Sequence, residues 1–211
     1  MPKLPSTTRW PPLLDQLRPA LAQVGASSAI ENHQRRSAMS ANLAEADLAE
    51  GHVELGLRQY REALDLLGDA MGNVYGDPFV ILLSAAAVCA HALAGQSPKV
   101  ADHVHRMVES SLIKLHPNGY TDLPLTGSVA AAVGAYDLST GNVGPGIELL
   151  ALAVVMRGRQ DFASLQHARL IAFARGIVGD QQWFDAVNTV SRYPRATTRE
   201  AVLAALRGSR G

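Results

Sequence analysis

Three glycines at a nearly constant spacing constrain the fold of this chain more than any other feature. Gly51, Gly95 and Gly141 lie 44 and 46 residues apart, and each stands between two alanine-rich stretches with helical periodicity. Repetition of helix–turn–helix units at such a period is typical of arrays of helical hairpins, in which each hairpin buries its apolar face against its neighbours. We therefore expect an array that offers a binding surface rather than a reaction centre.

The residues between these glycines predict helices throughout. Asp77-Pro78 and Ser97-Pro98 each place a capping side chain before a proline, which is typical of a helix start. No segment shows sustained alternation of apolar and polar residues, so we expect essentially no sheet. The pattern predicts an all-α fold of about nine or ten helices. Its expected parts are an N-terminal arm and short helix over residues 1–26 and a helical array over 27–207, with pairs at about 38–71, 78–115 and 127–157, a long loop over 116–127 and capping helices over 161–207.

A pattern of small and bulky residues recurs around the first and third glycines. Around Gly51 it consists of Ala44, Gly56, Tyr60 and Ala63; around Gly141 it consists of Gly134, Gly146, Leu150 and Ala153. Small residues at these offsets allow two antiparallel helices to approach closely, and the bulky residue fills the wedge beside them.

The middle copy departs from this pattern, because Val88 replaces the small residue and Ala101 fits only with an insertion after Gly95. The arrangement resembles the tetratricopeptide repeat, which implies a superhelical array of antiparallel helix pairs. The period is longer than the roughly 34 residues of that repeat, so HEAT-like hairpins of about 40–47 residues are the competing interpretation.

The last two thirds of the chain carry a second resemblance. The segments that carry it are the run from Gly141 to Ala153, then Arg157, Asp161, residues 170–179 and Trp183–Ala186. Together, over about residues 40–207, they are similar to the helical C-terminal tails of large multi-domain bacterial transcriptional activators of the antibiotic-regulatory-protein and large LuxR types. In that family a DNA-binding domain and a P-loop ATPase accompany the helical region, and neither is recognised in this sequence. The resemblance implies a regulatory domain that senses or relays a signal by contact with a protein or a ligand.

Charge and composition argue against several classes of protein. The 19 lysines and arginines balance the 19 aspartates and glutamates, so no net field draws the chain to nucleic acid or to anionic lipid. The single Cys89 cannot form an internal disulfide. The longest apolar run, Phe79–Ala94, falls short of the roughly 18 residues that mark a membrane span, and no basic-then-apolar leader begins the sequence. We expect a cytoplasmic protein with no membrane segment and no direct nucleic-acid contact.

The polar residues do not form a recognisable catalytic or metal-binding motif. His103 and His105 lie about 200° apart around a helix axis, so they face different ways. His52 and His91 fall in separate hairpins, without a cysteine or acidic partner at a recognisable ligand spacing. Four acidic residues gather near the first turn glycine and are interpreted as a solvated face: Glu45, Asp47, Glu50 and Glu54. With no nucleophile elbow present, we expect no catalytic residue, no metal site and no cofactor.

The hairpin repeat also predicts which residues line the concave side of the array. These are small or apolar for the most part: Ala38, Ala41, Glu45 and Leu48 from the first copy, Leu82, Ala85, Cys89 and Ala92 from the second, and Ser128, Ala131, Ala135 and Leu138 from the third. Two interpretations stay open. Either an apolar helix fills this groove, from a partner or from residues 12–24 of the same chain, or these residues are packed core.

The hypothesis that joins these observations is a non-enzymatic protein–protein interaction or signal-relay domain of a bacterial transcriptional regulator. Its partner is a second protein or another domain of the same regulator, and a homodimer is open because the ends of an array need covering. The alternatives are a stand-alone adaptor with the same fold and a small-molecule sensor whose ligand lies between hairpins. Trp183-Phe184 is interpreted as packing on the preceding helix, with an interface anchor as the alternative, and Tyr120 is the candidate for an exposed loop aromatic.

Overall fold

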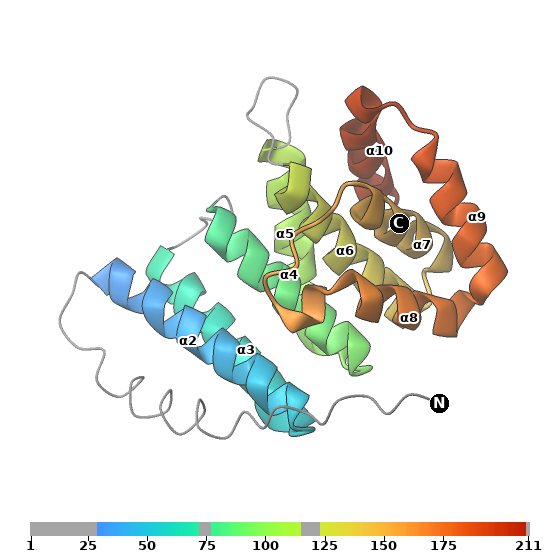
Figure 1. The fold of residues 1–211 in the computed structure, drawn as a ribbon. Helices are drawn as coiled ribbons and strands as arrows, with labels where there is room; N and C mark the ends of the chain where they lie inside the picture. Colours follow the sequence, from blue (N-terminus) through green and yellow to red (C-terminus); the bar gives the residue numbers. More distant parts are fainter. Residues whose placement is uncertain (1–28, 72–76, 115–122, 210–211) are drawn as a thin grey trace. The chain divides into compact units, whose positions relative to one another are not determined.

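The computed structural model describes residues 29–71, 77–114 and 123–209 (Figure 1). Within these ranges the regular elements are nine α-helices and two short 3₁₀ helices, with no strand, which confirms the all-α prediction. They are α2 (Ala29–Ala49), α3 (Val53–Met71), α4 (Pro78–Leu93), η1 (Ser97–Val100), α5 (Ala101–Lys114), α6 (Leu123–Thr140), α7 (Val143–Val155), η2 (Ala163–Leu165), α8 (His167–Val178), α9 (Asp180–Ser191) and α10 (Arg195–Gly208). The predicted arm over 1–26, the segment 12–24 and Tyr120 lie outside the described residues.

The chain divides into two compact units, Met1–Met71 and Gly72–Gly211. In the described part of the first unit, α2 and α3 pack extensively along each other. The second unit contains α4 to α10 with both 3₁₀ helices. The boundary falls between the first and second helix pairs expected from the sequence, so each unit is described by itself.

The close packing of α2 and α3 depends on a glycine at their contact. A Cβ atom built on Gly56 would lie 2.8 Å from the carbonyl oxygen of Ala44 and 2.7 Å from the side chain of Leu48. Tyr60 is fully buried beside this contact, and its hydroxyl donates a hydrogen bond to the carboxylate of Glu45. The small residues therefore permit the approach and the bulky one fills the adjoining space, as the pattern around Gly51 predicts.

The same arrangement returns in α6 and α7, within the second unit. A Cβ atom on Gly134 would lie 2.8 Å from the carbonyl oxygen of Gly146, and one on Gly146 would lie 2.8 Å from the amide nitrogen of Leu138. Leu150, 1% exposed, takes the place that Tyr60 has in the first unit. Two copies of the sequence pattern thus produce the same local packing.

The middle copy is packed differently. In the second unit α4 contacts α6 far more extensively than it contacts α5. Every residue from Val80 to Ala92 is buried, including Ser84 and His91. A helix that is buried all round forms the centre of a domain and does not present one apolar stripe to one neighbour.

The two predicted helix starts have different outcomes. Asp77 caps α4, since its carboxylate accepts a hydrogen bond from the amide of Phe79 at 2.8 Å with Pro78 in the first turn. Ser97 is not a cap: it is the first residue of η1, for which Gln96 is the N-cap residue, and its hydroxyl pairs with that of Ser139 in α6. The 3₁₀ helix occupies the place of the insertion inferred after Gly95 and delays the start of α5.

The prediction of a long loop over 116–127 is wrong at the C-terminal end of that range. Helix α6 begins at Leu123, and Pro124 stands in its first turn, where the missing amide of proline costs no hydrogen bond. The carbonyl oxygen of Pro124 instead accepts hydrogen bonds from the Ser128 hydroxyl at 3.1 Å and from the amide of Arg159 at 3.2 Å. A proline that sequence reasoning assigned to a loop is therefore part of a helix start that anchors the segment after α7.

The last helix covers apolar surface of the second unit. Helix α10 contacts α5, α6 and α7, and α9 packs on α7. Val202 and Leu206 of α10 are fully buried. None of the helices in the described ranges combines the length and the apolar character needed to cross a lipid bilayer.

Candidate functional site

The three turn glycines end their helices in the same way. Gly51, Gly95 and Gly141 have positive φ angles of 86°, 68° and 90°. The residue after each glycine donates its amide to a carbonyl oxygen five residues earlier, at 2.8 Å each time: His52 to Asp47, Gln96 to His91 and Asn142 to Asp137. With the glycine amide bonded three residues back, this is the Schellman motif, in which the glycine supplies a left-handed conformation that other residues adopt at a cost.

Each motif has a buried polar side chain at its base. Asp47, His91 and Asp137 are 1%, 0% and 2% exposed. The Nδ1 atom of His91 lies 2.7 Å from the carbonyl oxygen of Ala87. Burial raises the pKa of the Asp137 carboxyl, and hydrogen bonds from Ser209 and Asn142 offset part of that rise.

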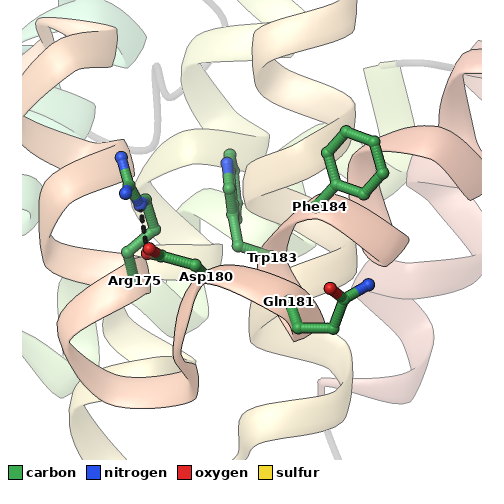
Figure 2. Close-up of a pocket in the computed structure, with 5 residues that line it drawn as sticks. All are labelled: Arg175, Asp180, Gln181, Trp183 and Phe184. Atoms are coloured by element: carbon green, nitrogen blue, oxygen red, sulfur yellow. Dashed lines mark hydrogen bonds and ion pairs between the residues drawn. The ribbon is translucent and has the colours of Figure 1, made fainter.

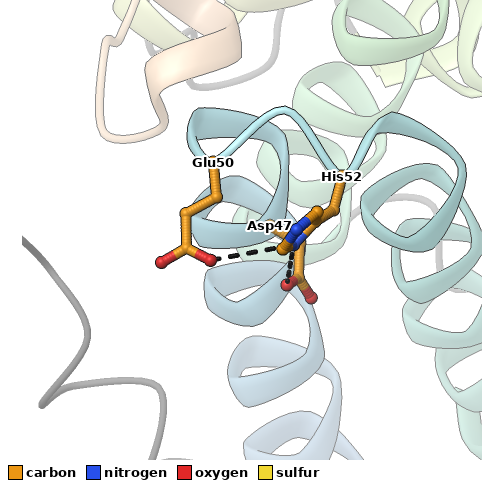
Figure 3. Close-up of side chains that lie close together, drawn as sticks. All are labelled: Asp47, Glu50 and His52. Atoms are coloured by element: carbon orange, nitrogen blue, oxygen red, sulfur yellow. Dashed lines mark hydrogen bonds and ion pairs between the residues drawn. The ribbon is translucent and has the colours of Figure 1, made fainter.

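At the first turn two further polar side chains approach the buried carboxylate (Figure 3). The Nδ1 atom of His52 lies 3.5 Å from Oδ1 of Asp47 and 3.7 Å from Oε2 of Glu50. One donor atom from each of the three residues lies within 4.8 Å of the other two. The side chains of His52 and Glu50 are 58% and 35% exposed, so the cluster opens to solvent above Asp47. Among the described residues, this is the group whose side chains have the ligand types and proximity that a metal ion requires.

Sequence reasoning missed this cluster because the contact crosses a turn. The expectation of no metal site took His52 to have no cysteine or acidic partner at a recognisable ligand spacing, whereas Asp47 and Glu50 stand just before Gly51 and His52 directly after it. The Schellman motif joins the third residue from the helix end to the second residue past it by a backbone hydrogen bond. Asp47 and His52 occupy these positions, with Glu50 between them. A glycine preceded by Asp at four residues and followed directly by His is the signal that could have found them.

A second candidate lies at the turn between α8 and α9 (Figure 2). An open depression of about 390 Å³ is lined by Arg175 of α8 and by Asp180, Gln181, Trp183 and Phe184 of α9. The Nε atom of Arg175 lies 2.6 Å from Oδ1 of Asp180, across Gly179 with its φ of 81°. The hydrogen bond from the Arg175 guanidinium lowers the pKa of the Asp180 carboxyl. The depression thus has an ion pair along one edge and aromatic rings along another.

The two aromatic residues at this turn have different environments. Trp183 is 8% exposed and Phe184 is 60% exposed, so the interpretation of both residues as packed on the preceding helix does not hold for Phe184. Consecutive helical residues point about 100° apart, and of these two the one that faces the core is Trp183. The structure therefore buries Trp183 and leaves Phe184 on the surface. Aromatic and arginine side chains are enriched at protein–protein interfaces.

The predicted groove residues are mostly buried. Ala38, Glu45 and Leu48 are partly exposed, and the other nine are buried: Ala41, Leu82, Ala85, Cys89, Ala92, Ser128, Ala131, Ala135 and Leu138. The residues from the first copy belong to the first unit and the others to α4 and α6, which pack on each other in the second. A buried side chain offers no surface to a partner, so the burial favours the packed-core interpretation.

No protein-family model, curated protein or solved structure matches this chain.

Proposed function

We propose that this chain is a non-enzymatic protein-interaction domain that contacts its partner through the turn between α8 and α9. The observation that carries the proposal is Phe184, a large apolar side chain left 60% exposed beside an open depression. Full burial of a phenylalanine side chain is worth about 1.5–3 kcal/mol relative to exposure. A partner that covers the exposed part of this ring gains a corresponding share of that stabilisation, which the fold itself does not use.

The lining of the depression defines the chemistry of the partner. The rings of Phe184 and Trp183 suit an apolar side chain projecting from a helix or a loop. Around them Gln181 and the Arg175–Asp180 pair supply donors and acceptors for a polar rim. An apolar anchor flanked by polar groups is therefore the contact that this surface fits.

We further propose that the partner belongs to the same bacterial transcriptional regulator as this chain. The resemblance of residues of about 40–207 to activator tails supports a role in a bacterial transcriptional regulator, with the partner a further domain or protein of that regulator. The repeated packing of α2 on α3 and of α6 on α7, with the same glycine-ended turn, supports a tetratricopeptide-like array of antiparallel pairs. A stand-alone adaptor would use the same surface without a link to transcription.

The size of the protein in its source cells tests this proposal. An antibody against the chain reports its mass after denaturation and the size of its native complex. A polypeptide several times larger than 22.4 kDa supports a multi-domain regulator. A 22.4 kDa polypeptide inside a larger native assembly supports the adaptor. A native species that is the 22.4 kDa monomer, under all growth conditions, contradicts protein interaction as the function.

A further inference from the structure

The turn between α2 and α3 brings together one imidazole and two carboxylates, from His52, Asp47 and Glu50. Imidazole nitrogen and carboxylate oxygen are the ligands with which proteins bind Zn²⁺ and related divalent transition metals, and three protein ligands with one open position is a common composition. All three residues belong to the first unit, so the cluster depends on one helix pair alone.

The distances fit a metal ion of this class. With metal–ligand bonds of about 2.0–2.2 Å, two ligand atoms on a tetrahedral ion lie about 3.4 Å apart. The Nδ1 atom of His52 lies 3.5 Å from the Asp47 oxygen and 3.7 Å from the Glu50 oxygen. The Asp47 and Glu50 oxygens lie within 4.8 Å of each other, so Glu50, which is partly exposed, would move toward Asp47 for all three atoms to reach one ion (Figure 3).

The backbone holds the ligands in place before any ion binds. The 2.8 Å hydrogen bond from the His52 amide to the Asp47 carbonyl oxygen fixes the two residues beside each other, and Gly51 provides the left-handed turn. The Asp47 side chain is 1% exposed and so has little rotational freedom to lose. Preorganised ligands reduce the entropic cost of binding. A buried carboxylate with a second carboxylate nearby also favours a cation at this point.

The equivalent turns provide an internal comparison. They have the same backbone hydrogen bonds, but the corresponding residues are His91, Ala94 and Gln96 at the second turn and Asp137, Thr140 and Asn142 at the third. Neither set contains two carboxylates and an imidazole. The motif therefore forms without this trio, and the trio is a property of the first turn.

From this geometry we propose that Asp47, Glu50 and His52 bind a divalent transition cation through two carboxylate oxygens and one imidazole nitrogen, with a remaining position open to solvent. The open position follows from the exposure of His52 and Glu50. This site does not involve the α8–α9 surface. A test of metal binding therefore neither supports nor contradicts the proposed protein contact.

Calorimetric titration of the full chain with Zn²⁺ tests the proposal, after removal of bound metal by a chelator and above the ordinary histidine pKa of about 6.5. We expect one tight site, weakened at least about tenfold by His52→Gln and by Glu50→Gln, because loss even of groups that only support a ligand costs about 10–100-fold. Both residues are on the surface, so far-UV circular dichroism should report an unchanged fold. Asp47 is left intact because it is buried in the helix pair.

His105→Gln is the matched control. His105 is exposed, and its Nε2 atom lies 3.5 Å from Oε1 of Glu109, so it has the same kind of contact with one carboxylate only. Zn²⁺ affinity of this variant should equal that of the wild type. The proposal is overturned if the wild type shows no tight site, which would mean a histidine–carboxylate ion pair only. It is also overturned if His52→Gln and His105→Gln bind Zn²⁺ equally well.

Discussion

Gly134 of α6 faces the backbone of Gly146 in α7 without room for a side chain between them. A Cβ atom on Gly134 would lie 2.8 Å from the Gly146 carbonyl oxygen and 2.8 Å from the Leu150 amide nitrogen. Both neighbours are backbone atoms, which cannot rotate away as the end of a flexible side chain can. The distance between these two helices is therefore set by the two glycines.

Gly134→Ala should destabilise the protein although alanine is the better helix former. Overpacking of a tight contact costs about 1–3 kcal/mol, and the gain in helix propensity of about 1 kcal/mol offsets only part of it. The measurement is the free energy of unfolding in urea. Gly176→Ala is the control, because Gly176 lies within α8 with open space around its missing Cβ, and it should raise stability by about 0.5–1 kcal/mol. Equal effects of the two substitutions would contradict the account.

Gly141→Ala should destabilise for a different reason. A Cβ atom at Gly141 meets nothing within 4 Å, so packing is not at issue, but its φ of 90° is unfavourable for a residue with a side chain. We expect a loss of about 1–2 kcal/mol. Gly141→Asn should lose less stability than Gly141→Ala, since asparagine tolerates the left-handed region better than alanine does. If both variants were as stable as the wild type in thermal unfolding, the glycine would have no conformational role there.

Asp137 should make stability depend on pH. Because burial raises its pKa above the ordinary 3.8, the native state binds this proton more tightly than the unfolded state does. Its contribution to stability is fully present below pH 3.8 and is lost as the pH rises through the raised pKa. Asp137→Asn removes this titration. The free energy of unfolding of the variant should therefore rise relative to that of the wild type as the pH increases from acid to neutral. Urea unfolding of both proteins at two pH values measures the change, and a difference that is constant with pH would refute it.

Truncation to alanine should affect stability far more at Trp183 than at Phe184. Phe184→Ala removes an exposed ring and should change the free energy of unfolding by no more than about 0.5 kcal/mol. Trp183→Ala removes a ring that is 8% exposed and should cost about 3–5 kcal/mol. A large loss of stability in Phe184→Ala would mean that this ring supports the fold and is not available to a partner.

Local features of this fold follow from the sequence, and the partners of the middle helices do not. A glycine between two helical stretches, with small residues at fixed offsets, was enough to predict the close contacts at Gly56 and Gly146. The packing of α4 on α6 was beyond the pattern, because a helix that is apolar all round has no face that indicates its neighbour.

The candidate sites were also only partly predictable from the sequence. Trp183 and Phe184 were interpreted together as packing on the preceding helix, and the exposure of Phe184 was found only in the structure. The meeting of Asp47 with His52 depends on a turn conformation, which a search for ligands at helical spacing does not include. Both sites are therefore produced by the geometry of short turns, at Gly179 and at Gly51.

Photo-cross-linking at position 184 tests the central claim, that the α8–α9 surface contacts a protein. A photoreactive phenylalanine analogue replaces Phe184 in the chain expressed in its source cells, and in a control it replaces Ala204, an exposed residue of α10. The account predicts a discrete adduct of higher mass from position 184, absent from position 204 and weakened when Arg175→Glu reverses the charge at the rim. No adduct from position 184, or the same adducts from both positions, would contradict the claim.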